Sequence, residues 1–271
     1  MKKLQNHVIL FDEECPMCRV YIKAFVQTGM LAENGRESYQ QTPAEICHLI
    51  DRQRAANEIA LVNTESGEVT YGIASLFKVI GNSMPVFRPL FVFKPFLYIM
   101  AKLYAFISYN RKVIIPAATK VNSIQPTFKA IYRIAYLLLT WLGTSYILTV
   151  YAHLLTEYVP LGSAYREYFI CGGQMIFQGI IIYFYKREKL WDYLGNMMTI
   201  SFAGSIILIF GLIVDQIVHL HPVVYILYFL MVAGLMFLEH IRRTKLLQLG
   251  WLMTITWVIY RLFVLGLIFS I

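Results

Sequence analysis

Charged side chains are scarce in this chain of 271 residues: Asp, Glu, Lys and Arg make up 15% of it, and hydrophobic residues make up 58%. A soluble domain averages about 25% charged and about 45–50% apolar residues. The mean hydropathy is +0.57. The composition therefore excludes an ordinary soluble protein. It predicts an integral membrane protein in contact with the lipid bilayer, with the apolar surplus after Pro126.

The sequence also lacks the pattern expected of a secretory signal peptide. The start Met1-Lys2-Lys3 is basic, but the apolar run from Leu4 to Phe11 is short and interrupted by polar residues. We therefore expect a bacterial inner (plasma) membrane protein whose N-terminal domain stays in the cytoplasm. Permanent structural disulfides are unusual in that compartment, which favours a reducible cysteine pair.

No basic helix with interleaved aromatic residues occurs, although the formal net charge is +8. The basic residues instead form short runs beside apolar segments, as membrane-flanking charges do. This distribution argues against nucleic acid as a partner.

The chain has only four cysteines, and one pair forms a C-x-x-C motif, Cys15 and Cys18. The motif follows a short apolar run, residues 7–11, and precedes a helical pattern over residues 19–27. This strand–motif–helix order is typical of thiol–disulfide exchange. A zinc site would need Cys47 and His48 as further ligands, which is poor spacing. Haem attachment would need His at the position of Arg19, and two purely structural cysteines are a third alternative.

The chemistry expected of the motif follows from its place at a helix start. Free N–H groups and the positive end of the helix dipole favour a thiolate on Cys15. Pro16 suits the first helical position. Basic residues in the helix add positive field, which Glu13 and Glu14 oppose. We expect Cys15 to attack and Cys18 to be the buried resolving thiol.

The residues around this motif resemble the DCC family of thiol–disulfide oxidoreductases, named for an Asp-x-x-Cys-x-x-Cys signature. Asp12, Cys15 and Cys18 match it. Two further stretches are similar, residues 67–76 (Gly-Glu-Val-Thr-Tyr-Gly-Ile-Ala-Ser-Leu) and residues 103–111 (Leu-Tyr-Ala-Phe-Ile-Ser-Tyr-Asn-Arg). The resemblance covers roughly residues 7–115, and the family usually has Gly where Glu13 or Glu14 stands.

The resemblance implies a cytoplasmic thioredoxin-like redox domain. It also implies that Asp12 influences proton movement or holds the turn before Cys15. No bound cofactor is expected beyond the dithiol itself. Thioredoxin or glutathione would be the reductant, and the C-P-x-C order is closer to glutaredoxin.

The element order predicted for the N-terminal domain, residues 1–82, is βαβαββα, as in thioredoxins. The expected strands are residues 7–12, 36–41, 59–63 and 68–71, and the expected helices are residues 16–29, 43–56 and 73–80. Thioredoxins place a cis-proline before the third strand. Asn57-Glu58 occupies that place here, with no proline nearby.

Residues 83–125 form an amphipathic connector that completes the DCC-like region. Pro85, Pro89 and Pro95 divide it, and cations interrupt its apolar runs. No uncharged stretch reaches the 18–20 residues that a span requires. Its helices either lie at the membrane interface or pack over the redox domain.

Residues 126–271 read as an all-α membrane domain of about five spans. We expect them at Ala130–Leu155, Tyr168–Tyr185, Gly195–Val218, Val223–Leu238 and Leu249–Ile271. Basic runs at residues 186–189 and 242–245 flank alternate loops. The positive-inside rule places these runs in the cytoplasm with the N-terminus, and the C-terminus outside.

Polar residues inside the spans are secondary candidates. Cys171 is either a relay thiol or, more simply, a small packing residue. Asp215 and His219 share a helix face and could pair at the outer boundary, near His221. Arg261 needs a partner, for which Asp215, Asp192 or a lipid phosphate are guesses.

Two further expectations concern histidines. Glu239 and His240 read as solvated at the inner boundary. Haem ligation by His153 with His219 or His221 is a remote alternative.

The sequence thus predicts a membrane-anchored thiol–disulfide oxidoreductase of the protein-disulfide reductase type, acting on a protein or small-molecule disulfide. Two alternatives stay open. One is a transmembrane redox relay that uses a quinone or haem. The other is a non-enzymatic thiol-sensing membrane protein or transporter subunit.

Overall fold

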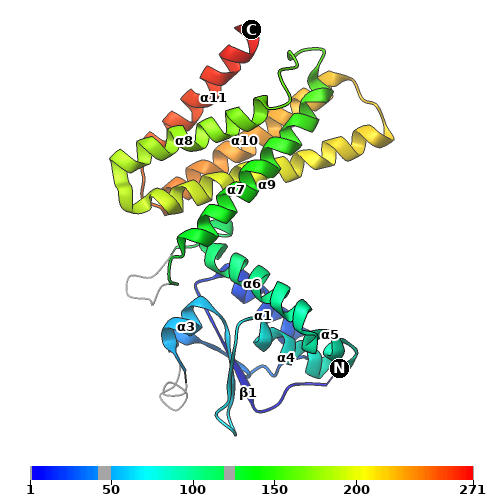
Figure 1. Cartoon of the computed structure of the whole chain (residues 1–271), viewed down its shortest axis with the longest axis vertical. Coiled ribbons are helices and arrows are strands. Elements are labelled where there is room, and N and C mark those ends of the chain that lie inside the picture. The colour runs from blue at the N-terminus through cyan, green and yellow to red at the C-terminus, as the bar shows by residue number, and fades with distance from the viewer. Residues whose placement is uncertain (1, 42–49, 119–125, 271) are drawn as a thin grey trace. The chain divides into compact units, whose positions relative to one another are not determined.

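The computed structural model describes residues 2–41, 50–118 and 126–270. Its chain divides into two compact units, residues 1–132 and 133–271. The first unit contains a small mixed sheet, and the second consists of long helices (Figure 1).

The sheet of the first unit has four strands in the order β2-β1-β3-β4. Strand β1 (His7–Phe11) pairs in parallel with β2 (Arg36–Ser38) and antiparallel with β3 (Ala60–Asn63). Strand β4 (Val69–Tyr71) pairs antiparallel with β3. All four strands fall within the ranges expected from the sequence, and each is one to three residues shorter than expected.

Side chains of both sheet faces are buried, because strand residues alternate between faces. One face carries a core that includes Ile9 and Leu61 together with Ile22 from α1 (Pro16–Gln27) and Val79 from α4 (Ile73–Ser83). The opposite face carries a second core. Its buried members are Leu10, Tyr39, Ile50, Ala55, Ala56, Ala60 and Val62.

The expected helix over residues 43–56 differs from the structure. Residues 42–49, including Cys47 and His48, lie outside the described residues. Helix α3 (Arg52–Asn57) begins only after Asp51, whose side chain caps it by accepting a hydrogen bond from the Arg54 backbone N–H at 2.9 Å. An Asp N-cap starts a new helix, so one continuous helix across this position is wrong.

The described part of the connector, residues 83–118, contains a 3-10 turn (Pro85–Phe87) and the α-helices α5 (Arg88–Val92) and α6 (Lys94–Ile114), of which α6 is amphipathic. One face buries polar as well as apolar side chains, at positions 108, 110, 111 and 113. The other face exposes large apolar residues, including Tyr98, Ile99, Leu103 and Ile107. Packing of α6 within the first unit is therefore one of its roles.

Four helical stretches of the described chain are long and apolar enough to cross a membrane: Ala130–Leu155, Arg166–Ile217, Pro222–Leu246 and Leu252–Ser270. A fifth would be the pair Pro85–Val92 and Lys94–Ile114, bent by 88°, if it is taken as one span. The chain is therefore compatible with an integral membrane protein.

The second and third expected spans fall, apart from Val218, within the single stretch Arg166–Ile217. It contains α8 (Arg166–Lys186) and α9 (Leu190–Ile217), separated by a 3-10 turn, Arg187–Lys189. The Tyr193 hydroxyl donates to Gln178 Oε1 at 2.9 Å. Residues that far apart would be about 22 Å apart in one straight helix. The stretch is therefore folded back on itself (Figure 1).

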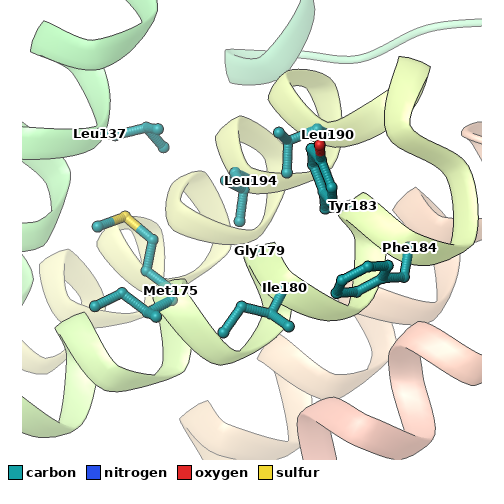
Figure 2. Close-up of a pocket in the computed structure, with 9 residues that line it drawn as sticks. Leu137, Met175, Gly179, Ile180, Tyr183, Phe184, Leu190 and Leu194 are labelled. Carbon is teal, nitrogen blue, oxygen red and sulfur yellow. The ribbon is translucent and has the colours of Figure 1, made fainter.

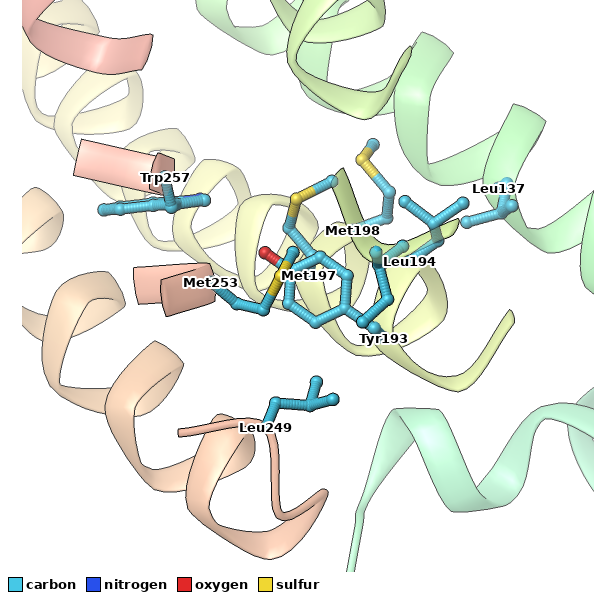
Figure 3. Packing of buried hydrophobic residues seen from close by; sticks show 9 residues of the cluster. Leu137, Tyr193, Leu194, Met197, Met198, Leu249, Met253 and Trp257 are labelled. Carbon is cyan, nitrogen blue, oxygen red and sulfur yellow. The ribbon is translucent and has the colours of Figure 1, made fainter. Parts of the chain in front are cut away.

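The remaining helices of the second unit are α7 (Ala130–Ala152), α10 (Pro222–Leu246) and α11 (Leu252–Ser270). Figure 3 shows one apolar cluster to which α7, α9 and α11 contribute, with Leu137 from α7, Tyr193, Met197 and Met198 from α9, and Met253 and Trp257 from α11. Helix α10 continues eight residues beyond Leu238, where the fourth span is expected to end, because Glu239 pairs with Arg242 and Arg243 along its surface.

Candidate active site

Cys15 is the N-cap of α1, directly after β1 and a tight turn. Its backbone N–H donates to the Asp12 carbonyl at 3.1 Å, which closes that turn. Its Sγ accepts a hydrogen bond from the Cys18 backbone N–H at 3.4 Å. Pro16 occupies the first helical position, where its missing N–H costs nothing. The sulfur therefore takes the place of a capping oxygen at the positive end of the helix.

The two thiols have very different acidities. A hydrogen bond from the Cys18 side chain, with further help from the Cys18 backbone N–H and the Arg111 charge, lowers the pKa of Cys15 to about 6 against the opposing effect of burial. The hydrogen bond to Cys15, together with burial, raises the pKa of Cys18 well above its usual range. Both are free thiols, 7% and 3% exposed. The arrangement holds one thiolate and one thiol.

Asp12 lies behind the cysteines as half of a buried ion pair. Its Oδ2 is 2.8 Å from Arg111 Nη2, and both side chains are about 5% exposed. Its Oδ1 accepts from Gln40 Nε2 at 2.9 Å and from the Glu14 backbone N–H at 3.1 Å. Asp12 therefore holds the turn before Cys15.

Arg111 is the site residue that the sequence argument does not single out. It comes from the end of α6, 99 residues after Asp12. The same Nη2 donates to the Ala56 carbonyl at 2.6 Å, so Arg111 links the cysteine turn to the segment before β3. The sequence points to Arg111 only through the Asn-Arg pair that ends residues 103–111, the third of the stretches that resemble the DCC family.

Helix α6 fixes the start of β3 through two more side chains. The Ser108 hydroxyl donates to the Asn57 carbonyl at 2.5 Å. The Tyr104 hydroxyl accepts from the Ile59 backbone N–H at 3.1 Å. These contacts surround the Asn57-Glu58 position, where a thioredoxin has its proline. Side chains of α6 thus order the backbone there.

The second DCC-like stretch also reaches this region. Gly72 caps α4 with φ +65° and ψ −139°. A Cβ at Gly72 would lie 2.8 Å from Glu58 Oε2 and 3.4 Å from Tyr104 Cε1. All three stretches that carry the resemblance therefore meet in the first unit.

The polar residues of the second unit form separate groups. Asp215 accepts a hydrogen bond from Tyr225 at 2.8 Å and lies 3.5 Å from His219 Nδ1, so the expected pairing of Asp215 and His219 is confirmed. Arg261 lies over the Trp257 ring at 5.1 Å. Asp192 pairs with Arg133 instead, so neither aspartate is the partner of Arg261.

His240 differs from its expected solvated state. It is 1% exposed, and its two ring nitrogens lie 3.2 Å from the Tyr193 hydroxyl and 3.1 Å from Thr254 Oγ1. Its ring stacks on Trp257, with centroids 5.1 Å apart. The sequence suggests an exposed His240 because the charged residues Glu239 and Arg242 lie beside it. Successive helix residues point in different directions, however, so His240 can be buried while these neighbours are not.

An apolar groove of about 500 Å³ lies on the second unit between α7, α8 and α9 (Figure 2). Only Tyr183 contributes a polar group among its lining residues, which are Leu137, Met175, Ile176, Gly179, Ile180, Tyr183, Phe184, Leu190 and Leu194. Such an apolar surface suits a lipid chain, and its lining residues do not suggest a catalytic site. Within residues 2–41, 50–118 and 126–270, no three His, Cys, Asp or Glu side chains gather as metal ligands would.

Comparison with known proteins adds no further identification. No family model, no curated protein and no solved structure matches the chain. Inference about its activity therefore depends on the geometry around Cys15 and on the resemblance of its motifs.

Proposed function

We propose that the first unit is a thiol–disulfide oxidoreductase of the DCC type, with Cys15 as nucleophile and Cys18 as resolving thiol. The observation that carries the proposal is the Cys15 sulfur at the N-cap of α1, hydrogen-bonded by Cys18. A capping sulfur with pKa near 6 is a thiolate at neutral pH, and the thiolate is the reactive form.

The order of strands and helices around the C-x-x-C motif supports the same proposal. The C-x-x-C motif lies between a central strand, β1, and the helix that follows it. β1 has a parallel neighbour on one side and an antiparallel one on the other. This order is the one expected of a thioredoxin-like βαβ–ββα arrangement, with the motif at the end of the first strand.

The reaction balances as a two-electron exchange. The Cys15 thiolate attacks one sulfur of a substrate disulfide, forms a mixed disulfide and releases the other sulfur as a thiolate. Cys18 then gives its proton to the first released substrate thiolate and attacks Cys15 Sγ, which releases the second substrate thiolate and leaves a Cys15–Cys18 disulfide. Glutathione or thioredoxin supplies the electrons that restore the dithiol. The hydrogen bond to Cys15, together with burial, keeps the Cys18 thiol protonated until the mixed disulfide has formed.

The cellular location follows from charge rather than from the fold. The basic runs at residues 186–189 and 242–245 support a cytoplasmic first unit under the positive-inside rule. Reductants of that compartment can reach it there. The second unit would anchor the domain to a bacterial inner membrane.

The test is the midpoint potential of the Cys15–Cys18 pair in the purified full chain, measured by alkylation across glutathione ratios. A reversible two-electron couple between about −200 and −270 mV would support a cytoplasmic dithiol reductase. A pair that never oxidises would overturn the proposal.

A matched pair of variants tests the two roles. In Cys18→Ser, the mixed disulfide with glutathione should accumulate, because nothing resolves it. In Cys15→Ser, no mixed disulfide should form. Accumulation in both variants, or in neither, would contradict the assigned order of attack.

A further inference from the structure

Helices α5 and α6 present large apolar side chains on the surface of the first unit. On α6, Tyr98, Ile99 and Leu103 are 65%, 56% and 50% exposed. Ile99 and Leu103 are one turn apart and therefore share a face of the helix. Val92 and Phe93, at the bend between the two helices, are 76% and 58% exposed. A continuous apolar surface of this kind marks a contact with another protein or with a membrane.

The exposed face of α6 continues to the start of the first apolar span, α7. Tyr109 and Asn110 follow Tyr98 and Ile99 by eleven residues, which is about three helical turns, so they lie on the same face. The Tyr109 ring stacks on Tyr132 with centroids 4.9 Å apart. Asn110 Nδ2 donates to the Tyr132 carbonyl at 3.0 Å. Tyr132 belongs to the first turn of α7 and to the first unit. One end of this face is therefore covered by the residues that lead into the span.

Helix α4 holds the bend between α5 and α6. The Phe77 ring of α4 stacks on Phe91 of α5 at 4.2 Å and on Phe96 of α6 at 5.8 Å between centroids. Arg88 Nε donates to the Gly81 carbonyl at 2.8 Å. The helical segments on either side of the bend differ in direction by 88°. They cannot straighten into one membrane span without breaking these contacts.

The free part of α6 is also too short to cross a bilayer. The end of α6 belongs to the first unit, because Ser108 and Arg111 are buried there. The remaining stretch, Lys94–Ile107, is about 21 Å long at about 1.5 Å per residue, whereas a hydrocarbon core is about 30 Å thick. The length therefore suits a helix that lies in the membrane interface.

The charge of this region indicates what covers it. No Asp or Glu occurs between Glu68 and Glu157, whereas Lys94 and Lys102 are exposed on α6. Lys102 Nζ lies over the Tyr98 ring at 5.4 Å, so a cation and an aromatic ring are side by side. A symmetric dimer through this face would bring the lysines of both copies together without a carboxylate from residues 69–156 to pair them. Anionic lipid headgroups carry the complementary charge.

We propose that α5 and α6 form an interfacial membrane anchor for anionic phospholipids. The exposed face of α6 and the Val92-Phe93 bend enter the acyl chains of the leaflet that faces the first unit. Lys94 and Lys102 contact the phosphates of that leaflet. Arg111, from the end of the same helix, reaches the cysteine site, so the anchor holds the dithiol near the lipid surface. Lipid binding does not depend on the redox activity proposed for that site.

The test is lipid quenching of an NBD probe on Ile99→Cys in the full chain without its native cysteines. The chain is embedded in nanodiscs of phosphatidylcholine and phosphatidylglycerol in equal parts, with some lipid carrying a doxyl quencher. The matched control is the probe on Glu33→Cys, in a polar loop of the same unit. Both positions are exposed, so neither change should alter the Tm. Quenching is expected at position 99 and not at position 33.

Three outcomes of this experiment would overturn the anchor. The first is equal quenching, or none, at the two positions. The second is protection of the probe at position 99 from aqueous iodide without quenching by lipid, which would indicate a second copy of the chain on this face. The third is stronger quenching by a doxyl group at the end of the acyl chain than by one near the headgroup, which would place α6 at the bilayer centre.

A matched pair of charge variants tests the preference for anionic lipid. Lys94→Gln with Lys102→Gln should raise the rate at which Ile99→Cys reacts with an impermeant maleimide by roughly tenfold in these nanodiscs, because each lysine near an anionic surface favours binding. Lys3→Gln with Lys23→Gln removes the same charge elsewhere in the first unit and should leave the rate unchanged. Equal increases in both pairs would overturn the role of the two α6 lysines. So would equal rates for the parent Ile99→Cys chain with and without phosphatidylglycerol.

Discussion

Cys15 reactivity should depend on pH in a way that reports its helix-capping position. Its pKa is lowered from 9.0 to about 6, mainly by hydrogen bonding from Cys18. The alkylation rate of the full chain with iodoacetamide should therefore rise through a midpoint near pH 6 and level off above pH 7, whereas an unperturbed thiol titrates near 8.5. Cys15→Ser should lack this phase.

The same shift has a stability consequence with a definite sign. The folded pKa of Cys15 lies below its unfolded value, so the stabilisation is fully present above about pH 9 and is lost as pH falls through about 6. Unfolding of the reduced full chain should thus become easier between these limits as pH falls. A midpoint for alkylation near 8.5 in the folded protein would contradict both expectations.

The buried pair of Asp12 and Arg111 gives a second prediction. Arg111→Met should destabilise the first unit by about 3–5 kcal/mol, because it leaves a buried carboxylate without its partner. It should also raise the pKa of Cys15, since the Arg111 charge lowers it. Urea unfolding followed by exposure of Cys18 to alkylation, in a Cys15→Ser background, measures the first effect.

The matched control is the double variant Asp12→Leu with Arg111→Met, which removes both charges together. Its loss of stability should be smaller than that of Arg111→Met alone. Losses that simply add would mean that the two side chains act independently, against the 2.8 Å geometry.

Among individual residues, what could be predicted from the sequence is what is local. Cys15, Cys18 and Pro16 form a helix start within four positions, so spacing alone identifies them. Arg111 could not be assigned in this way, because its partner Asp12 is 99 positions away and only the fold brings them together. His240 was misjudged for a related reason: its buried partners come from α9 and α11.

At the scale of elements, Gly72 and Gly29 can be compared for the stability lost when each is replaced by alanine. Both have positive φ, +65° and +71°, but Gly72 has ψ −139°, a combination that is nearly restricted to glycine. Gly72→Ala should cost about 1–3 kcal/mol of first-unit stability. Gly29→Ala, with no atom within 4 Å of its Cβ, should cost about 1 kcal/mol. The Cys18 exposure assay measures both.

The backbone rather than the side-chain contact should account for the Gly72 effect. Glu58 Oε2, 2.8 Å from the added Cβ, is the end of a flexible side chain and can move aside. Adding Glu58→Ala to Gly72→Ala should therefore restore little stability. Full restoration would assign the cost to the contact instead.

Strands β1 and β3 and helices α1 and α4 were predictable because apolar residues recur within each of them. The start of α3 was not predictable, because Asp51 looks like any polar residue in the sequence. Only the structure shows that its side chain caps α3 by accepting a hydrogen bond from the Arg54 backbone N–H. The end of α10 was misplaced because a cluster of charges reads as a loop. Here Glu239 instead bonds Arg242 and Arg243 on the helix surface.

At the scale of the whole molecule, the number of membrane crossings decides where the C-terminus lies. The stretch Arg166–Ile217 counts as one apolar helical segment, yet the Tyr193–Gln178 hydrogen bond shows that it doubles back at Arg187–Lys189. Helix α8 has 21 residues and α9 has 28, so each alone is long enough for a hydrocarbon core of about 30 Å. We therefore predict five crossings, which would put the two chain ends on opposite sides of the membrane.

The last prediction follows from this five-span topology. Single cysteines in a background without the native four, at Glu33, Glu188 and Leu220, should react with a membrane-impermeant maleimide in a fixed pattern. Glu33→Cys and Glu188→Cys should label from the cytoplasmic side, because cations flank the Arg187–Lys189 turn. Leu220→Cys and a tag after Ile271 should be reached only from the other side. A tag on the same side as Glu33 would mean an even number of crossings and would contradict the five-span topology.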